Sequence, residues 1–460
     1  MLHRIGMKKI IFLLVTLFLF LATTPVTATS DDYTESTTFA NLSSSLQEDQ
    51  ITASGAILMD ARTGKILYEK NSNEKYYPAS TTKIMTALLA FEKGNLDDPV
   101  TADRCVYYLG RGSSIIGLKP DETMTLRELL YGLLLESGND AAVAIAVHIG
   151  GSVEGFADMM NAKAKELGLS NTHFTNPHGL HDPDHYTTAA DLARIALEAR
   201  KYPEFREMVN TYVYKKGPTN LCDTERTWIN SNRLISTNPK EPYRYEYATG
   251  MKTGYTSKAK HSLVATALRD DMELLTVVLH DSKEGKWKST ICMFEWGFEN
   301  FTSRKLVQDE DKILATVDVK DASSEDAGKG KLELLVDASD NPYTTLPKGD
   351  FTKITEELAV DSDIRAPIRS GQVLGKVVYK LNGDVLFEKN LIASRDVEKK
   401  KALFSVTETV KSSSFSSSSP WWWLVVPAVL LLGLISRILY VHRRKKRRRY
   451  LYHYYSSYRR

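Results

Sequence analysis

Three short motifs follow one another along the chain, and their order restricts both its fold and its chemistry. They are Ser-Thr-Thr-Lys at residues 80–83, Ser-Gly-Asn at residues 137–139 and Lys-Thr-Gly at residues 252–254. Together they supply a hydroxyl nucleophile, an amine that can take its proton, a second hydroxyl with an amide, and a cation beside a hydroxyl. These groups suit the opening of an amide bond through an acyl-serine. The fold must therefore bring together segments that lie far apart in the sequence.

The local setting of each motif carries more information than the motif itself. Similar Ser-x-x-Lys and Ser-x-Asn patterns occur at residues 72–75, 257–260, 236–238 and 339–341. Ser80 differs because it directly precedes the apolar run 84–90, which predicts a helix. At the start of a helix, Ser80 and Lys83 lie one turn apart on the same face, and the helix N-terminus favours developing negative charge.

Lys83 can act as the base for Ser80 only if its pKa falls, through burial or through a second cation such as Lys252. Each motif also has an interpretation without catalysis. Ser80 alone would be a helix N-cap and Lys83 a surface lysine. The Ser-Gly-Asn motif would be a helix C-cap, and the Lys-Thr-Gly motif, which lies before the predicted strand 262–268, a surface turn.

The apolar pattern of residues 51–300 predicts an α/β domain with an antiparallel sheet. Two hairpins are expected near its ends, at residues 56–68 and 262–279. Helices are predicted between and after them, over residues 82–93, 125–135, 141–149, 152–168, 188–201 and 286–298. Strands at both ends of the domain indicate one sheet that is assembled from both ends and covered by helices.

The pattern of apolar and polar residues changes after residue 300. Residues 303–396 alternate apolar and polar side chains and contain the hairpin signal Asn-Gly-Asp at 382–384, so a small all-β domain is predicted. Residues 397–419, which end in a serine-rich run, are expected to form a flexible stalk. Residues 29–50, rich in Ser, Thr and Asp, are expected to form a flexible leader.

Both ends of the chain carry membrane-related signals. Residues 1–28 predict a secretory signal peptide, with a basic start, an apolar stretch at 10–22 and a small-x-small cleavage pattern; an uncleaved anchor is the alternative. Residues 420–441 predict a transmembrane helix with three tryptophans at one end. The run of Arg and Lys at 443–449 places the tail 442–460 in the cytoplasm and favours contact with anionic lipid over nucleic acid. We therefore expect a single-pass protein of the cell membrane whose catalytic domain is extracytoplasmic.

The surroundings of the motifs add a resemblance to a known family. Residues 78–86, 136–142, 174–180 and 250–256 resemble the serine D-alanyl-D-alanine carboxypeptidases, the low-molecular-mass penicillin-binding proteins. The resemblance covers residues 50–300 and implies a β-lactamase/transpeptidase-like fold, and the following β region resembles the C-terminal domain of that family. The sequence departs from the family at Ala259-Lys260-His261, where a glycine often follows the alanine.

The resemblance also implies a substrate and residue roles. The substrate would be a peptidoglycan stem peptide that ends in D-Ala-D-Ala, β-lactams would be inhibitors, and neither a cofactor nor a metal is implied. The backbone N–H groups of Ser80 and Tyr255 would form the oxyanion hole. The catalytic residues would be Ser80, Lys83 and Ser137, and the substrate-binding residues would be Asn139, Lys252, Thr253, Gly254 and Tyr255.

Three other functions remain alternatives at this point. A class A β-lactamase would need a glutamate-bearing loop after the second motif, and residues 171–186 contain no glutamate. A zinc peptidase is suggested by His173, His178, His181 and His185 with Asp182 and Asp184, although Pro183 interrupts the spacing. The third alternative is a membrane sensor that β-lactams acylate with little turnover.

Overall fold

The computed structural model describes residues 46, 48–107, 109, 112–307, 312–337, 341 and 343–400. The predicted signal peptide, most of the leader, residues 401–419 of the predicted stalk, the predicted transmembrane helix 420–441 and the basic tail lie outside these residues. No helix within the described part of the chain is long and apolar enough to cross a membrane.

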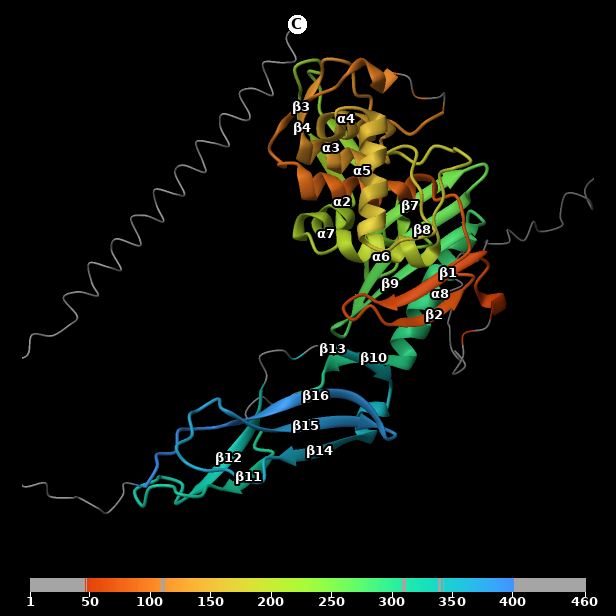
Figure 1. Ribbon diagram of the computed structural model, residues 1–460. Helices are drawn as coiled ribbons and strands as arrows, with labels where there is room; N and C mark the ends of the chain where they lie inside the picture. Colours follow the sequence, from red (N-terminus) through yellow and green to blue (C-terminus); the bar gives the residue numbers. More distant parts are fainter. Residues whose placement is uncertain are drawn as a thin grey trace, which may run out of the picture. The chain divides into compact units, whose positions relative to one another are not determined.

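The first part of the chain is built on a five-stranded antiparallel sheet with the order β2-β1-β9-β8-β7 (Figure 1). Its strands are β1 (Gly55–Asp60), β2 (Ile66–Lys70), β7 (Ala248–Thr256), β8 (Lys260–Arg269) and β9 (Met272–Asp281). Both predicted hairpins are confirmed, and β1 pairs with β9 so that Ala56 lies opposite Val278. The sheet is therefore assembled from the two ends of the domain, as the sequence predicts.

Helices cover both faces of this sheet. Figure 1 shows α2 to α7 grouped on one side, while α8 packs against β1, β8 and β9. The helices are α2 (Lys83–Lys93), α3 (Leu126–Leu134), α4 (Asn139–Gly150), α5 (Val153–Glu166), α6 (Ala189–Ala199), α7 (Pro203–Asn210) and α8 (Gly285–Asn300). The 3-10 helices are η1 (Glu48–Gln50), η2 (Ala79–Thr82), η3 (Arg104–Tyr107), η4 (Arg233–Ile235) and η5 (Asp350–Lys353).

Alternation along the strands explains why the sheet has two apolar faces. On β1, Ile57 packs into the core beneath α2 to α6, whereas Leu58 packs into the core beneath α8. On β9, Val277 and Val278 divide between the same two cores. Successive side chains of a strand point to opposite faces, so a strand that is buried on both faces is apolar throughout.

Helix starts agree closely with the sequence signals. Thr125 and Glu128 form the predicted capping box, in which each side chain accepts a hydrogen bond from the backbone N–H of the other residue. Ser152 and Thr188 cap α5 and α6. Short pairs of strands that were not predicted complete this part: β3 (Pro99–Thr101) with β4 (Thr123–Thr125), and β5 (Val213–Lys216) with β6 (Arg226–Ile229).

The structure does not support the alternative interpretation of the third motif as a surface turn. The Lys-Thr-Gly motif lies inside β7, which is an edge strand of the five-stranded sheet. Gly250 and Gly254 weaken the strand signal of this segment. Pairing with the strongly apolar β8 overrides that local preference.

The second part of the chain is all β, as predicted. A five-stranded antiparallel sheet with the order β11-β12-β16-β15-β14 is built from β11 (Ala315–Asp318), β12 (Lys331–Val336), β14 (Ile354–Val360), β15 (Val373–Leu381) and β16 (Asp384–Ala393). The turn between β15 and β16 contains Asn382 and Gly383, both with positive φ, which is the predicted hairpin signal. A two-stranded sheet pairs β10 (Phe301–Lys305) with β13 (Tyr343–Pro347).

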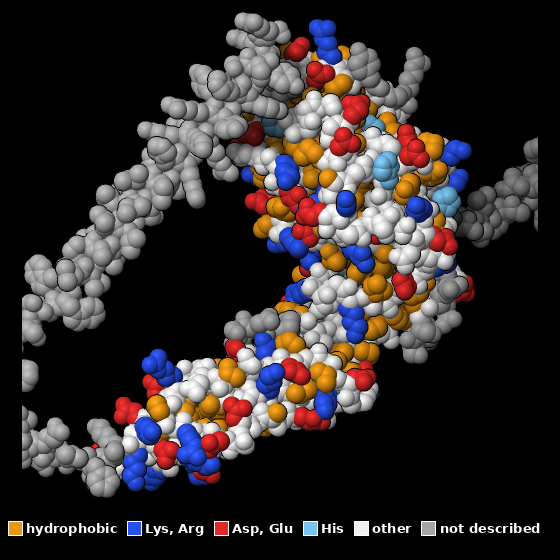
Figure 2. Space-filling view, viewed as in Figure 1, with side chains coloured by type: hydrophobic (Ala, Val, Ile, Leu, Met, Phe, Trp, Pro, Cys, Tyr) orange, Lys and Arg blue, Asp and Glu red, His pale blue; other side chains and the backbone are white. Residues whose placement is uncertain are grey.

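Charged side chains are mixed over the surface. Figure 2 shows acidic and basic side chains interspersed on the face that it presents, with apolar side chains between them. The full chain carries a net charge of only +3. Electrostatic effects on function must therefore be sought at individual sites.

Candidate active site

The first motif lies where η2 continues into α2. Ala79, directly before the serine, has a φ of 51°, a left-handed conformation that a non-glycine residue rarely adopts. This turn directs Ser80 and Lys83 to the same side, and the Nζ of Lys83 lies 3.1 Å from the Oγ of Ser80. Backbone strain of this kind persists only where the surrounding structure enforces it, and it concentrates at functional sites.

Lys83 is completely buried, which is unusual for a lysine. Its Nζ lies 2.6 Å from the Oδ1 of Asn139 and 2.7 Å from the backbone oxygen of His178. Burial, and then the positive charge of Lys252, hold the pKa of Lys83 well below 10.5, while Asp140 opposes this shift. A neutral amine that donates its two N–H groups to these two oxygens turns its lone pair toward the hydroxyl of Ser80, as a base for that hydroxyl requires.

The second motif lies between α3 and α4. Ser137 has a φ of 62°, and its Oγ is buried without a hydrogen-bond partner among the described residues. A buried hydroxyl that lacks a partner is costly in a resting protein and is available to a bound ligand. Asn139 begins α4 and accepts a hydrogen bond from Lys83, so that the second motif also positions the lysine of the first motif.

The third motif contributes the buried Lys252 and brings the backbone of β7 close to Ser80. Lys252 is completely buried. A Cβ atom at Gly254 would lie 2.9 Å from the backbone oxygen of Pro78 and 3.2 Å from the backbone nitrogen of Ser80, so glycine allows β7 to approach η2. Tyr255 follows, with an exposed side chain stacked on His261.

All three motifs line one pocket of about 310 Å³. Ser80, Ser137, Asn139 and Thr253 to Tyr255 contribute to its walls. The structure thus brings all eight predicted site residues into or against one cleft, with Lys83 and Lys252 buried behind its wall. Further walls come from residues 112–114, Gly179, Ser231, His261 and Lys286, to which the sequence analysis assigned no role in the site.

The loop of residues 174–186 packs against the start of α2 and contacts Lys83. The Nδ1 of His185 accepts a hydrogen bond from the backbone N–H of Thr175, so the proton resides on Nε2, which lies 2.8 Å from the Oγ1 of Thr82. Burial is the main cause that lowers the pKa of His178 and of His185 to about 3, so both rings are neutral at neutral pH. They add no charge beside Lys83.

The histidines considered as zinc ligands have other partners in the structure. His185 bonds to Thr82 and Thr175, His181 packs edge-on against Tyr77, and His173 bonds to the backbone oxygen of Asp184. Within the described ranges, no group of three or more His, Cys, Asp or Glu side chains is arranged to hold a metal ion.

Gly179 lets this loop pack closely against the turn at Ala79, directly before Ser80. Its φ is +83°, and a Cβ atom there would lie 1.8 Å from the backbone oxygen of Ala79. No side chain fits such a gap. The glycine is the sequence signal that the loop packs directly on the segment that carries Ser80.

Two contacts next to β7 extend the site beyond the motifs. The Oγ of Ser231 lies 2.7 Å from the Oγ1 of Thr253, and the Nζ of Lys286 lies 3.3 Å from the Nδ1 of His261. Burial, and then Lys286, lower the pKa of Lys252 to about 7, and burial is also the main cause that lowers the pKa of Lys286 to about 8. This end of the pocket therefore suits an anionic group, which would keep both lysines charged.

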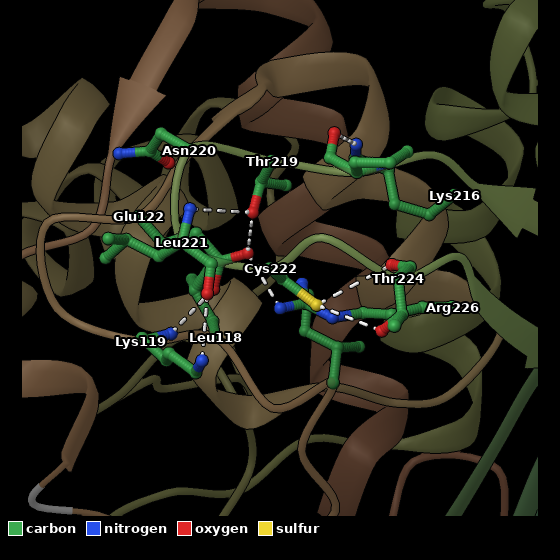
Figure 3. Close-up of polar contacts among 12 residues, drawn as sticks. Leu118, Lys119, Glu122, Lys216, Thr219, Asn220, Leu221, Cys222, Thr224 and Arg226 are labelled. Carbon is green, nitrogen blue, oxygen red and sulfur yellow. Dashed lines mark hydrogen bonds and ion pairs between the residues drawn. The ribbon is translucent and has the colours of Figure 1, made fainter.

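The buried carboxylate of Glu122 stabilises the β5–β6 hairpin, which lies before Ser231 in the chain. Figure 3 shows Glu122 bound by Thr219 and Arg226, with the Oγ1 of Thr219 at 2.6 Å and the Nη2 of Arg226 at 2.7 Å from its Oε1. The backbone N–H of Lys119 donates to the other oxygen of Glu122. Since Arg226 begins β6, which ends two residues before Ser231, this network ties the loop before β4 to the β5–β6 hairpin beside the pocket.

Comparisons with known proteins find related sequences and structures for both parts of the described chain. Residues 42–283 match the family model described as D-alanyl-D-alanine carboxypeptidase, and residues 301–399 match the C-terminal domain of penicillin-binding protein 5. The chain is 38% identical to D-alanyl-D-alanine carboxypeptidase DacF of Bacillus subtilis over 75% of this chain and 86% of that protein. It is 32% identical to DacC of Escherichia coli over 74% and 83% of the two chains. The crystal structure of penicillin-binding protein 5 from Haemophilus influenzae aligns with a TM-score of 0.59 at 32% identity, covering 77% of this chain and all of that one.

Proposed function

The chain belongs to the D-alanyl-D-alanine carboxypeptidase family, and from that premise we propose that it removes the terminal D-alanine of peptidoglycan stem peptides through an acyl-serine intermediate. The observation that carries the mechanism is the buried amine of Lys83, 3.1 Å from the hydroxyl of Ser80 and held by two carbonyl oxygens. A serine needs such a base to become a nucleophile.

The reaction then divides among the three motifs. The Oγ of Ser80 attacks the carbonyl carbon of the penultimate D-alanine while its proton moves to the Nζ of Lys83. The backbone N–H groups of Ser80 and Tyr255 stabilise the negative oxygen that forms. Ser137 passes a proton to the nitrogen of the leaving D-alanine as the amide bond breaks, and water afterwards hydrolyses the ester on Ser80.

The substrate-binding roles that we propose are those implied by the family resemblance, and the position of each group in or against the pocket supports them. Lys252 and Thr253 bind the terminal carboxylate, and Gly254 lets the substrate backbone approach β7. Asn139 binds the substrate amide in addition to its contact with Lys83. Because a β-lactam also presents a carboxylate beside a reactive amide, we propose that β-lactams acylate Ser80 and inhibit the enzyme.

We further propose that the enzyme is exported and anchored in the cell membrane. The apolar residues 420–441 followed by the basic run 443–449 support a single span with the tail in the cytoplasm. The N-terminal signal pattern supports export of the catalytic domain. Fractionation of cells that express the full chain, with protease added outside, tests this placement, and a soluble protease-resistant product would contradict it.

The decisive experiment combines labelling and turnover. Membranes that contain the full chain or its Ser80→Ala variant are treated with a fluorescent penicillin, and D-alanine release is measured from a peptide ending in D-Ala-D-Ala. We expect label and release with the native chain and neither with the variant. Labelling of Ser80→Ala at the native level would refute the role of Ser80, and labelling without release would indicate a sensor.

A further inference from the structure

The edge strand β7 sets the direction in which a bound peptide would run across the site. Lys252 and Thr253 lie at the proposed carboxylate end, and Gly254 lies against the backbone of Ser80. Among the described strands, β7 pairs only with β8, so an extended peptide can lie along its other edge. A peptide whose carboxylate is at Lys252 and whose scissile carbonyl is at Ser80 must continue past Tyr255 toward the turn that joins β7 to β8.

The turn between β7 and β8 carries two lysines. Lys258 and Lys260 flank Ala259 and are both exposed, and Lys260 has a φ of 58°. This is the stretch in which the sequence departs from the family pattern. Extended chains advance by about 3.3 Å per residue, so the residues that precede the penultimate D-alanine of the substrate reach this turn.

The neighbouring helix start adds more positive charge. Lys283 is exposed and Lys286 lines the pocket, and burial together with the charges of these two lysines lowers the pKa of His261 to about 4. In the part of the chain that the structure describes, none of Lys258, Lys260, Lys283 and Lys286 lies within 4.0 Å of an acidic side chain. The acid in the pocket wall, Glu136, accepts a hydrogen bond from the backbone N–H of Ile229 on β6.

We propose that Lys258 and Lys260 bind carboxylates in the stem peptide upstream of the scissile bond, so that the enzyme prefers anionic peptides to neutral ones. This inference rests on the proposed carboxypeptidase function and specifies its substrate class. Flexible lysines suit this task because an ammonium group attracts a carboxylate without requiring one fixed geometry. Since the lysines are exposed, the preference weakens as salt rises.

Matched synthetic peptides test the inference with the full chain. Acetyl-Glu-D-Ala-D-Ala is compared with acetyl-Gln-D-Ala-D-Ala, and acetyl-Glu-Ala-D-Ala-D-Ala with its Gln counterpart, by the kcat/KM of D-alanine release. We expect a roughly threefold to tenfold preference for Glu in at least one pair at low salt, the range that one or two exposed ion pairs supply. High salt and the double variant Lys258→Gln/Lys260→Gln should each reduce this preference to less than about twofold.

The control variant removes a lysine outside the pocket. Lys165→Gln on α5 changes the net charge in the same direction and should keep the preference, while the double variant should still hydrolyse the Gln peptides at the native rate. Equal hydrolysis of Glu and Gln peptides by the native chain, or loss of the preference in Lys165→Gln, overturns this inference and leaves the proposed carboxypeptidase function standing. Failure of the native chain to release D-alanine from any peptide overturns the proposed function and this inference with it.

Discussion

The Nζ of Lys83 lies 2.6 Å from the Oδ1 of Asn139, so the first and second motifs meet through one short hydrogen bond inside the protein. An uncharged amide oxygen at this place has a definite electrostatic consequence. It accepts a proton of the amine without stabilising the ammonium as strongly as a carboxylate would. Lys83 therefore keeps a partner and still has a low pKa.

Asn139→Asp should test this balance because it changes the charge and almost nothing of the shape. A carboxylate next to Lys83 raises the pKa of the amine, so acylation by a fluorescent penicillin at neutral pH should fall by about tenfold to a thousandfold. The ratio of the variant rate to the native rate at the same pH should rise as the pH rises, because the neutral amine returns. Asn210→Asp, an exposed change at the end of α7, serves as the control. A loss of rate that is independent of pH would contradict this account.

The pH dependence on the alkaline side should report Lys252. The pKa of Lys252 is lowered to about 7, so its positive charge is present below that pH and is lost above it. We expect kcat/KM for acylation to decline as the pH rises through 7 to 8, since the free enzyme then binds a carboxylate less well. Lys286→Met removes a nearby positive charge and should shift this decline to higher pH. Lys288→Met, exposed on the same helix, should leave it in place.

Gly179→Ala should destabilise the protein far more than another glycine change with similar backbone geometry. At Gly179 the new methyl group overlaps the backbone of Ala79. Overpacking that forces the backbone to move typically costs about 1 to 3 kcal/mol, and this cost adds to the conformational cost. At Gly168, which has a φ of +70°, nothing lies within 4 Å of the new Cβ, so only the conformational cost of about 1 kcal/mol remains. Urea unfolding measures both. Equal destabilisation would show that the overlap is relieved without cost.

Glu122→Gln should lower the free energy of unfolding, because it breaks the buried ion pair with Arg226. Burial by itself raises the pKa of Glu122, but hydrogen bonds from Thr219, Lys119 and Arg226 outweigh it and bring the pKa below 4.5. Removing the charge leaves Arg226 without its partner, which typically costs about 3 kcal/mol in a buried pair. Asp318→Asn breaks an exposed pair with Lys331 and should cost less than about 1 kcal/mol.

The same pair should also contribute to acid sensitivity. A carboxyl group whose pKa is lower in the folded state stabilises the fold above its unfolded pKa, and this contribution is lost as the pH falls through the folded pKa. Native protein should therefore lose stability in acid more steeply than Glu122→Gln. Parallel stability curves for the two proteins would contradict this contribution.

Local sequence determined much of the architecture. Alternating and apolar runs predicted both hairpins, the capping box at Thr125 fixed the start of α3, and Asn382 with Gly383 marked the turn between β15 and β16. These features are decided by neighbours in the chain and by backbone preferences. The types of chemical group in the site were likewise evident from three short motifs.

The tertiary structure decided what those groups can do. β7 is a strand because β8 pairs with it, and Lys83 has a low pKa because α2, the loop of residues 174–186 and Lys252 enclose it. Ser231 and Lys286 belong to the pocket only through contacts with Thr253 and His261. Burial and charge proximity depend on segments that meet across the fold. The sequence thus determined which chemical groups are available for the site, while long-range packing decided their burial, their orientation and their additional partners.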